Sequence, residues 1–97
     1  MPTYISLINW TDQGVRDFKQ TVSRAEAATA LADRMGGQIQ HIYWTVGPYD
    51  IVTVADFPDD ETGTAFLLAL GSQGNVRTTT LRAYDAETVT GIIGKLG

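Results

Sequence analysis

Apolar and polar positions follow two different periods along the chain. From Thr3 to Trp10 apolar side chains fall on both faces of a period-two pattern, which predicts a β-strand at the centre of a sheet. Residues 11–35 instead carry apolar side chains three and four positions apart, which is typical of helix. Ser23 and Glu26 have the spacing of a capping box, so we expect two helical pieces, the second beginning at Ser23. The apolar face predicted for the first piece consists of Val15, Phe18 and Val22.

The rest of the chain repeats this order of strand and helix. We expect strands at 38–46 and 49–57, a helix from Asp59 or Asp60 to about Gln73, a strand at 76–84 and a short terminal helix capped by Asp85. Gly47-Pro48 is typical of a tight turn, so the two middle strands are predicted to form a hairpin. The apolar residues of the terminal helix are Val89, Ile92, Ile93 and Leu96.

This order of elements is β-α-β-β-α-β followed by a helix. It predicts one α+β domain over residues 1–97, with the ferredoxin-like arrangement of a four-stranded antiparallel sheet and helices on one face. The other face would expose apolar and aromatic side chains over several hundred Å², which monomers seldom tolerate. We therefore expect a homo-oligomer, either a dimer or an assembly of dimers, in which a second copy covers that face.

Composition and charge narrow the range of partners. The 97 residues include seven Lys and Arg and eleven Asp and Glu, for a net charge of -4, and no basic residue lies between Met35 and Val76. An acidic chain without a basic stripe repels phosphate, so we expect no nucleic-acid partner and no membrane surface. Neither a membrane-spanning run nor a signal-peptide pattern is present. The chain also has no cysteine, and this composition is typical of a cytoplasmic protein.

Two titratable residues are candidates for chemistry. His41 is the one histidine, so it could serve as a general base or an axial haem ligand, or it could be a surface side chain with a satisfied hydrogen bond. A single histidine cannot form a multi-histidine metal site, and the sequence requires no cofactor. Asp50 follows the Gly-Pro turn and could be a carboxylate base, or it could accept backbone N–H groups and hold the hairpin in place.

An aromatic concentration suggests a pocket. Trp10, Tyr43, Trp44 and Tyr49 could line a site for a small apolar or aromatic ligand, or they could pack in the core and an interface. Alternation in the second strand predicts one face composed of Ile39, His41, Tyr43 and Thr45. The predicted pocket comprises Trp10, His41 and Tyr43, with Tyr49 and Asp50 at its mouth, on the assumption that Trp10 shares that sheet face. Phosphate-binding loops and a hydrolase triad have no support in the sequence.

The segment from Tyr43 to Asp50 resembles the signature of the GYD-domain family, with its Gly, Tyr and Asp at Gly47, Tyr49 and Asp50. Pro48 completes this turn motif. The segments 4–14 and 74–83 are similar to the opening and closing parts of the same family. The resemblance implies a dimeric α/β-barrel, in which two ferredoxin-like sheets pack face to face. It implies no particular reaction.

Two functions are consistent with these residues. The first is a homo-oligomeric module that binds a small molecule or a protein and carries out no catalysis, because few titratable groups converge. The alternative is a small cofactor-independent oxygenase or isomerase, with His41 or Asp50 as base and Tyr43 or Trp10 holding the substrate. A haem-linked enzyme with His41 as the iron ligand is a variant of that alternative.

Overall fold

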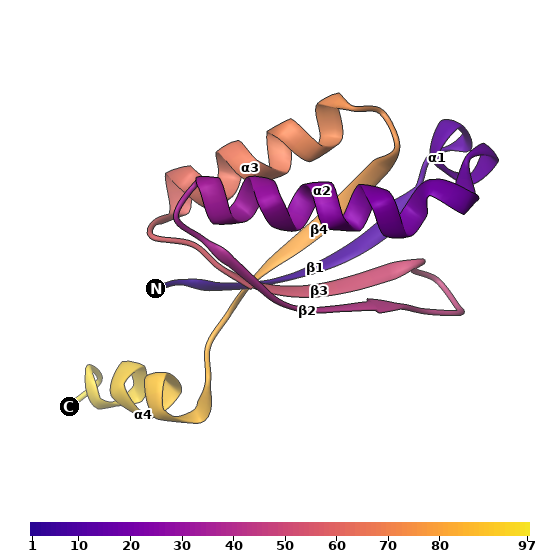
Figure 1. The fold of residues 1–97 in the computed structure, drawn as a ribbon. Helices are drawn as coiled ribbons and strands as arrows, with labels where there is room; N and C mark the ends of the chain where they lie inside the picture. The colour runs from indigo at the N-terminus through magenta and orange to yellow at the C-terminus, as the bar shows by residue number, and fades with distance from the viewer.

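A computed structural model describes all residues, 1–97, as a four-stranded antiparallel sheet with two long helices on one face (Figure 1). The elements are β1 (Thr3–Trp10), α1 (Asp12–Arg16), the 3₁₀ turn η1 (Phe18–Gln20), α2 (Thr21–Arg34), β2 (Gln38–Trp44), β3 (Ile51–Asp56), α3 (Asp60–Ser72), β4 (Val76–Ala83) and α4 (Ala86–Gly94). The strand order is β2-β3-β1-β4, and all neighbouring strands are antiparallel. The predicted α+β ferredoxin-like fold is confirmed, with β1 between β3 and β4.

Aspartate side chains cap the starts of two of the helices. Asp59 accepts the Thr62 backbone N–H at 2.7 Å at the start of α3, and Asp85 accepts the Thr88 N–H at 2.8 Å at the start of α4. These hydrogen bonds hold the pKa of both aspartates below its usual value. The start predicted for α2 at Ser23 is wrong, because η1 runs directly into that helix and α2 already begins at Thr21.

The core lies between the sheet and the two long helices. Ala32, Ala55, Phe57 and Phe66 form its buried cluster, with the rings of Phe57 and Phe66 4.9 Å apart. Ala32 is completely buried, so α2 approaches the sheet closely at a residue that has almost no side chain.

A β-bulge in β2 decides which side chains share a face. Ile39 pairs with Ala55, but the next pair in the ladder is His41 with Val54, so Gln40 is an extra residue. Ile39 therefore faces the helices, while His41 and Tyr43 lie on the opposite face. The predicted sharing of one face by Ile39, His41 and Tyr43 is wrong for Ile39, because the bulge interrupts the alternation.

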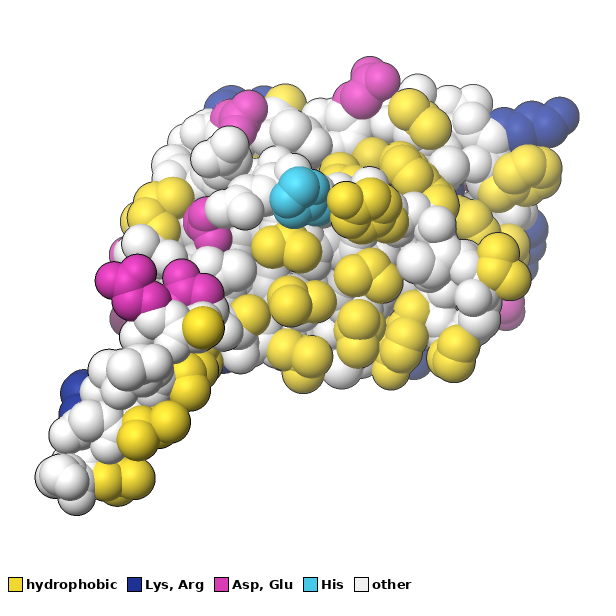
Figure 2. All heavy atoms as spheres, turned by 90° about the horizontal axis from the view of Figure 1, so that it is seen from below, with side chains coloured by type: hydrophobic (Ala, Val, Ile, Leu, Met, Phe, Trp, Pro, Cys, Tyr) yellow, Lys and Arg dark blue, Asp and Glu magenta, His cyan; other side chains and the backbone are white.

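The face of the sheet away from the helices is uncovered by the chain itself. We call it the open sheet face; its apolar and aromatic residues are Ile5, Leu7, His41, Tyr43, Val52, Val54 and Leu81. Figure 2 shows this side, with a broad group of apolar side chains that borders the single histidine. Tyr43 and Leu81 are among its exposed members, at 59% and 49% exposure.

The last helix is separate from the rest of the domain. All residues of α4 are exposed, and Figure 1 shows the helix beyond the end of β4, away from the sheet. Its predicted apolar stripe is present but touches no core, because Val89, Ile92, Ile93 and Leu96 are all exposed. None of the helices combines the length and the apolar composition needed to cross a bilayer.

The corner formed by α1, η1 and the start of α2 also differs from expectation. Val15, Phe18 and Val22 were predicted to be the inward face of a helix, but all three are exposed. The helix is interrupted after Arg16, and the 3₁₀ turn that follows directs this segment outward. We call these three residues the α1 corner.

Candidate functional site

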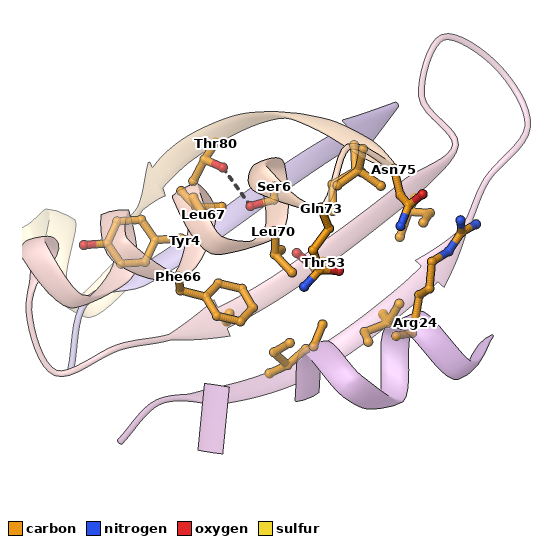
Figure 3. Close-up of a pocket in the computed structure, with 18 of the residues that line it drawn as sticks. Tyr4, Ser6, Arg24, Thr53, Phe66, Leu67, Leu70, Gln73, Asn75 and Thr80 are labelled. Atoms are coloured by element: carbon orange, nitrogen blue, oxygen red, sulfur yellow. Dashed lines mark hydrogen bonds between the residues drawn. The ribbon is translucent and has the colours of Figure 1, made fainter. Parts of the chain in front are cut away.

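A cavity of about 80 Å³ lies between the helix side of the sheet and helices α2 and α3 (Figure 3). We call it the inner cavity. Most of its wall is apolar and comes from the strands and from α3, including Ile8, Ile51, Phe66, Leu67 and Leu70. In Figure 3, Tyr4 and Phe66 lie toward one end of it, and Arg24 and Asn75 lie toward the other.

Two hydroxyl groups that line the inner cavity satisfy each other. The hydroxyl groups of Ser6 and Thr80 share a 2.8 Å hydrogen bond between β1 and β4, drawn in Figure 3. Ser6 is the one polar residue in the buried interior, and this bond accounts for its place there. Thr53 and Gln73 also line this part of the cavity (Figure 3).

The end of the inner cavity near α1 is polar. Its lining there includes Arg24, Gln73 and Asn75. The Arg24 guanidinium donates to the Gly14 carbonyl at 3.0 Å, which links α2 to α1. No Asp or Glu lines the cavity, and the one ion pair of the chain, Arg82 with Asp60, lies elsewhere.

A close backbone contact holds this polar end together. A Cβ atom at Gly14 would lie 2.0 Å from the carbonyl oxygen of Asn75, so only glycine permits α1 to approach the start of β4 so closely. The Thr11 backbone N–H donates to the same carbonyl at 3.0 Å, and its hydroxyl accepts the Gly14 N–H at 3.1 Å. The first turn of α1 is therefore fixed against the loop that precedes β4.

Trp10 has two different N–H groups in two different environments. Its backbone N–H donates to the Asp50 carboxylate at 2.9 Å. Its indole Nε1 is buried, borders the inner cavity region and is the one buried side-chain donor or acceptor of the chain without a hydrogen-bond partner. Leaving such a donor unpaired costs about 1–3 kcal/mol, so this N–H calls for a partner beyond the chain itself, such as a water molecule or a ligand.

The turn with the Gly-Pro-Tyr-Asp sequence ties the hairpin to the end of β1. The Asp50 N–H donates to the Ile8 carbonyl at 2.8 Å, and the Asn9 side-chain amide donates to the Pro48 carbonyl at 2.7 Å. Gly47 has a φ of 137°, a value that side chains disfavour. The geometry corresponds to the structural alternative considered for Asp50, except that its donor belongs to β1.

The predicted pocket residues do not come together. The rings of His41 and Tyr43 stack at 6.0 Å on the open sheet face, whereas Trp10 lies on the helix side. The assumption that Trp10 shares their face is wrong, because Trp10 alternates in register with Ile8 and not with the open face of β1. Of the predicted site residues, only Trp10 lines the inner cavity, and Tyr49 and Asp50 remain in the turn.

A second polar cluster closes the far end of the inner cavity. The Tyr4 hydroxyl donates to the Asp60 carboxylate, and the Arg82 guanidinium lies over the Tyr4 ring, 5.6 Å from its centre. Burial and the hydrogen bond to Asp60 raise the pKa of Tyr4 to about 12. The phenol thus keeps its proton at neutral pH. No three His, Asp or Glu side chains of the chain come together as a metal site.

Comparison with known proteins agrees with this architecture. The GYD domain matches residues 4–93. A protein of Thermus thermophilus named glutamine synthetase and cystathionine beta-lyase binding protein is 34% identical over 84 residues, which include 86% of this chain and 88% of that protein. The crystal structure of MtbAldR superposes with a TM-score of 0.68 at 12% identity, over 87% of this chain. The match covers 52% of the MtbAldR chain, about half its length, and it shows the fold alone.

Proposed function

Because the chain belongs to the GYD-domain family, we propose that it acts as a protein-binding module, a homodimer that associates with a metabolic enzyme and performs no catalysis itself. The similarity to the Thermus thermophilus protein carries this proposal, since that protein is named for binding glutamine synthetase and cystathionine beta-lyase. The similarity extends over 86% of this chain and 88% of that protein.

A second copy of the chain is the occupant we propose for the open sheet face. A folded monomer of this mass is expected to expose about 5,400 Å². This chain exposes 6363 Å². The excess of about 900 Å² is close to the roughly 800 Å² that each partner buries in a standard interface. The amount of uncovered surface therefore supports a dimer.

The position of α4 supports the same assembly. Its exposed apolar side chains are visible in the same view as the open sheet face (Figure 2). A second copy seated on the open sheet face would therefore bury part of α4 as well. His41 and Tyr43 would then belong to the interface between copies, where their stacked rings supply apolar contact.

The α1 corner is the surface we propose for the enzyme partner. It lies at the opposite end of the domain from α4, so a second copy on the open sheet face leaves it free (Figure 1). Phe18 is 53% exposed there between two exposed valines. Aromatic side chains of this kind supply much of the binding energy at protein interfaces.

Binding to the two enzymes named for the relative tests the proposal. The purified chain is titrated by calorimetry with glutamine synthetase and with cystathionine beta-lyase from its own source organism. We expect a micromolar or tighter complex with at least one of them. If neither enzyme binds the wild-type chain in the micromolar range, the proposed function is wrong.

A matched pair of variants tests the docking surface. Phe18→Ser should weaken the enzyme complex at least about tenfold, because it removes the central apolar side chain of the α1 corner. Lys19→Ser changes the neighbouring exposed residue and should leave the affinity unchanged. Equal affinities for the two variants would place the enzyme on another surface of the domain.

A further inference from the structure

The inner cavity has the charge pattern of a site for an anion with an apolar body. Its one charged lining residue is Arg24, in a chain whose net charge is -4. The Arg24 guanidinium makes one hydrogen bond, to the Gly14 carbonyl, and has no carboxylate partner. Several of its five N–H donors therefore remain available for a ligand.

The unpaired indole N–H of Trp10 belongs to the same end of the cavity. Trp10 pairs with Val76, and the next residue, Thr11, donates its backbone N–H to Asn75. The Arg24 guanidinium donates a hydrogen bond to Gly14, and Gly14 packs against Asn75. Trp10 and Arg24 thus both line the cavity, whose wall is mostly apolar and contains no carboxylate; Asp50, which accepts the backbone N–H of Trp10, is not part of that wall.

The size of the cavity limits what can fill it. About 10–15 Å³ is needed for one water molecule, and an apolar cavity of about 150 Å³ accepts benzene. The inner cavity, at about 80 Å³, has room for a short aliphatic chain and not for a nucleotide or a haem. We infer that the inner cavity binds a short-chain organic carboxylate, with its carboxylate at Trp10 and Arg24 and its alkyl chain against Leu70 and Phe66.

The side chains that line the inner cavity also predict which molecules similar to a short carboxylate bind poorly. An α-amino acid of equal length carries an ammonium group, and no carboxylate lines the cavity to receive it. A primary alcohol offers an acceptor to the indole but no charge to Arg24. We therefore expect butyrate and hexanoate to bind more tightly than the matching amino acids and alcohols. Each methylene should improve affinity about fourfold until the apolar space is full.

Nuclear magnetic resonance of the full chain labelled with ¹⁵N tests this site. Titration with butyrate should shift the indole ¹H–¹⁵N signal of Trp10 to saturation. The signal of Trp44, whose indole donates to the Thr21 hydroxyl at 2.9 Å, should move much less. If no carboxylate from acetate to hexanoate moves the Trp10 signal selectively, the inference is wrong.

Two variants separate the proposed contact from a packing role. Trp10→Phe keeps an aromatic ring but removes the N–H, so butyrate affinity should fall at least about tenfold. Trp44→Phe, outside the cavity, should bind butyrate as the wild type does. A Trp10→Phe chain that is folded and binds butyrate with unchanged affinity would overturn the assignment. Because these measurements contain no enzyme partner, their failure leaves the proposed protein-binding function untouched.

Discussion

The Asp50 carboxylate accepts the backbone N–H of Trp10 at 2.9 Å, and so joins the hairpin turn to the last residue of the central strand. The same aspartate donates its own N–H to the Ile8 carbonyl at 2.8 Å. Both the side chain and the backbone N–H of Asp50 therefore bind the turn to β1. This fastening orients the backbone from which the Trp10 indole extends toward the inner cavity.

Substitution of Asp50 should affect stability according to whether the new side chain can accept a hydrogen bond. Asp50→Asn retains an acceptor and should cost less than about 1.5 kcal/mol, whereas Asp50→Ala leaves the Trp10 N–H without a partner and should cost about 1–3 kcal/mol. Urea denaturation followed by circular dichroism measures both. Equal and negligible losses for the two variants would contradict the structural role of the carboxylate.

Gly14 and Gly71 should respond in opposite directions to the same substitution. Gly14→Ala places a methyl group 2.0 Å from the Asn75 carbonyl oxygen and should destabilise the fold by about 1–3 kcal/mol. Gly71→Ala lies in α3 with no atom within 4 Å of the new Cβ, and should stabilise it by about 0.5–1 kcal/mol. Thermal unfolding of both variants beside the wild type measures the difference. A Gly14→Ala chain as stable as the wild type would show that α1 can move away from β4.

The order of elements was predictable because each change of period and each cap is a local property of the chain. Asp59 and Asp85 cap α3 and α4 from within three residues of the N–H groups that they accept. The faces of the sheet were harder to predict. The extra residue Gln40 shifts which side chains of β2 face the helices. No local pattern of side chains predicts this bulge.

The candidate site was harder still to predict, because it depends on contacts between distant segments. The sequence groups Trp10 with His41 and Tyr43, but Trp10 lines the cavity on the opposite side of the sheet, because one sequence does not reveal the register between strands. Arg24 was missed because a single arginine in a helix is usually a solvated charge. Its place at the cavity wall, with its guanidinium bonded to Gly14 ten residues earlier, depends on how α2 packs against α1 and the sheet.

Burial of the Tyr4 phenol and its hydrogen bond to Asp60 should make stability depend on pH in the alkaline range. The folded-state pKa of Tyr4 is raised from 10.0 to about 12, so the protonated phenol is favoured by folding. Its contribution is fully present below pH 10 and is lost as the pH rises toward 12. We expect the urea midpoint of the wild type to fall more steeply across this range than that of Tyr4→Phe. Parallel curves would contradict the raised pKa.

Leu81 and Leu68 offer a matched test of the dimer. Leu81 lies on the open sheet face and is 49% exposed, whereas Leu68 lies on the outer side of α3 and is 70% exposed. Light scattering of the wild type at micromolar concentration should give at least twice the chain mass of 10.5 kDa. Leu81→Glu should give the monomer mass, because a charge buried between two sheets without a partner is strongly unfavourable. Leu68→Glu should remain dimeric, since its side chain stays in water in the proposed assembly. A wild-type chain of monomer mass, or a Leu81→Glu chain that remains dimeric, would show that the open sheet face is not the interface between copies.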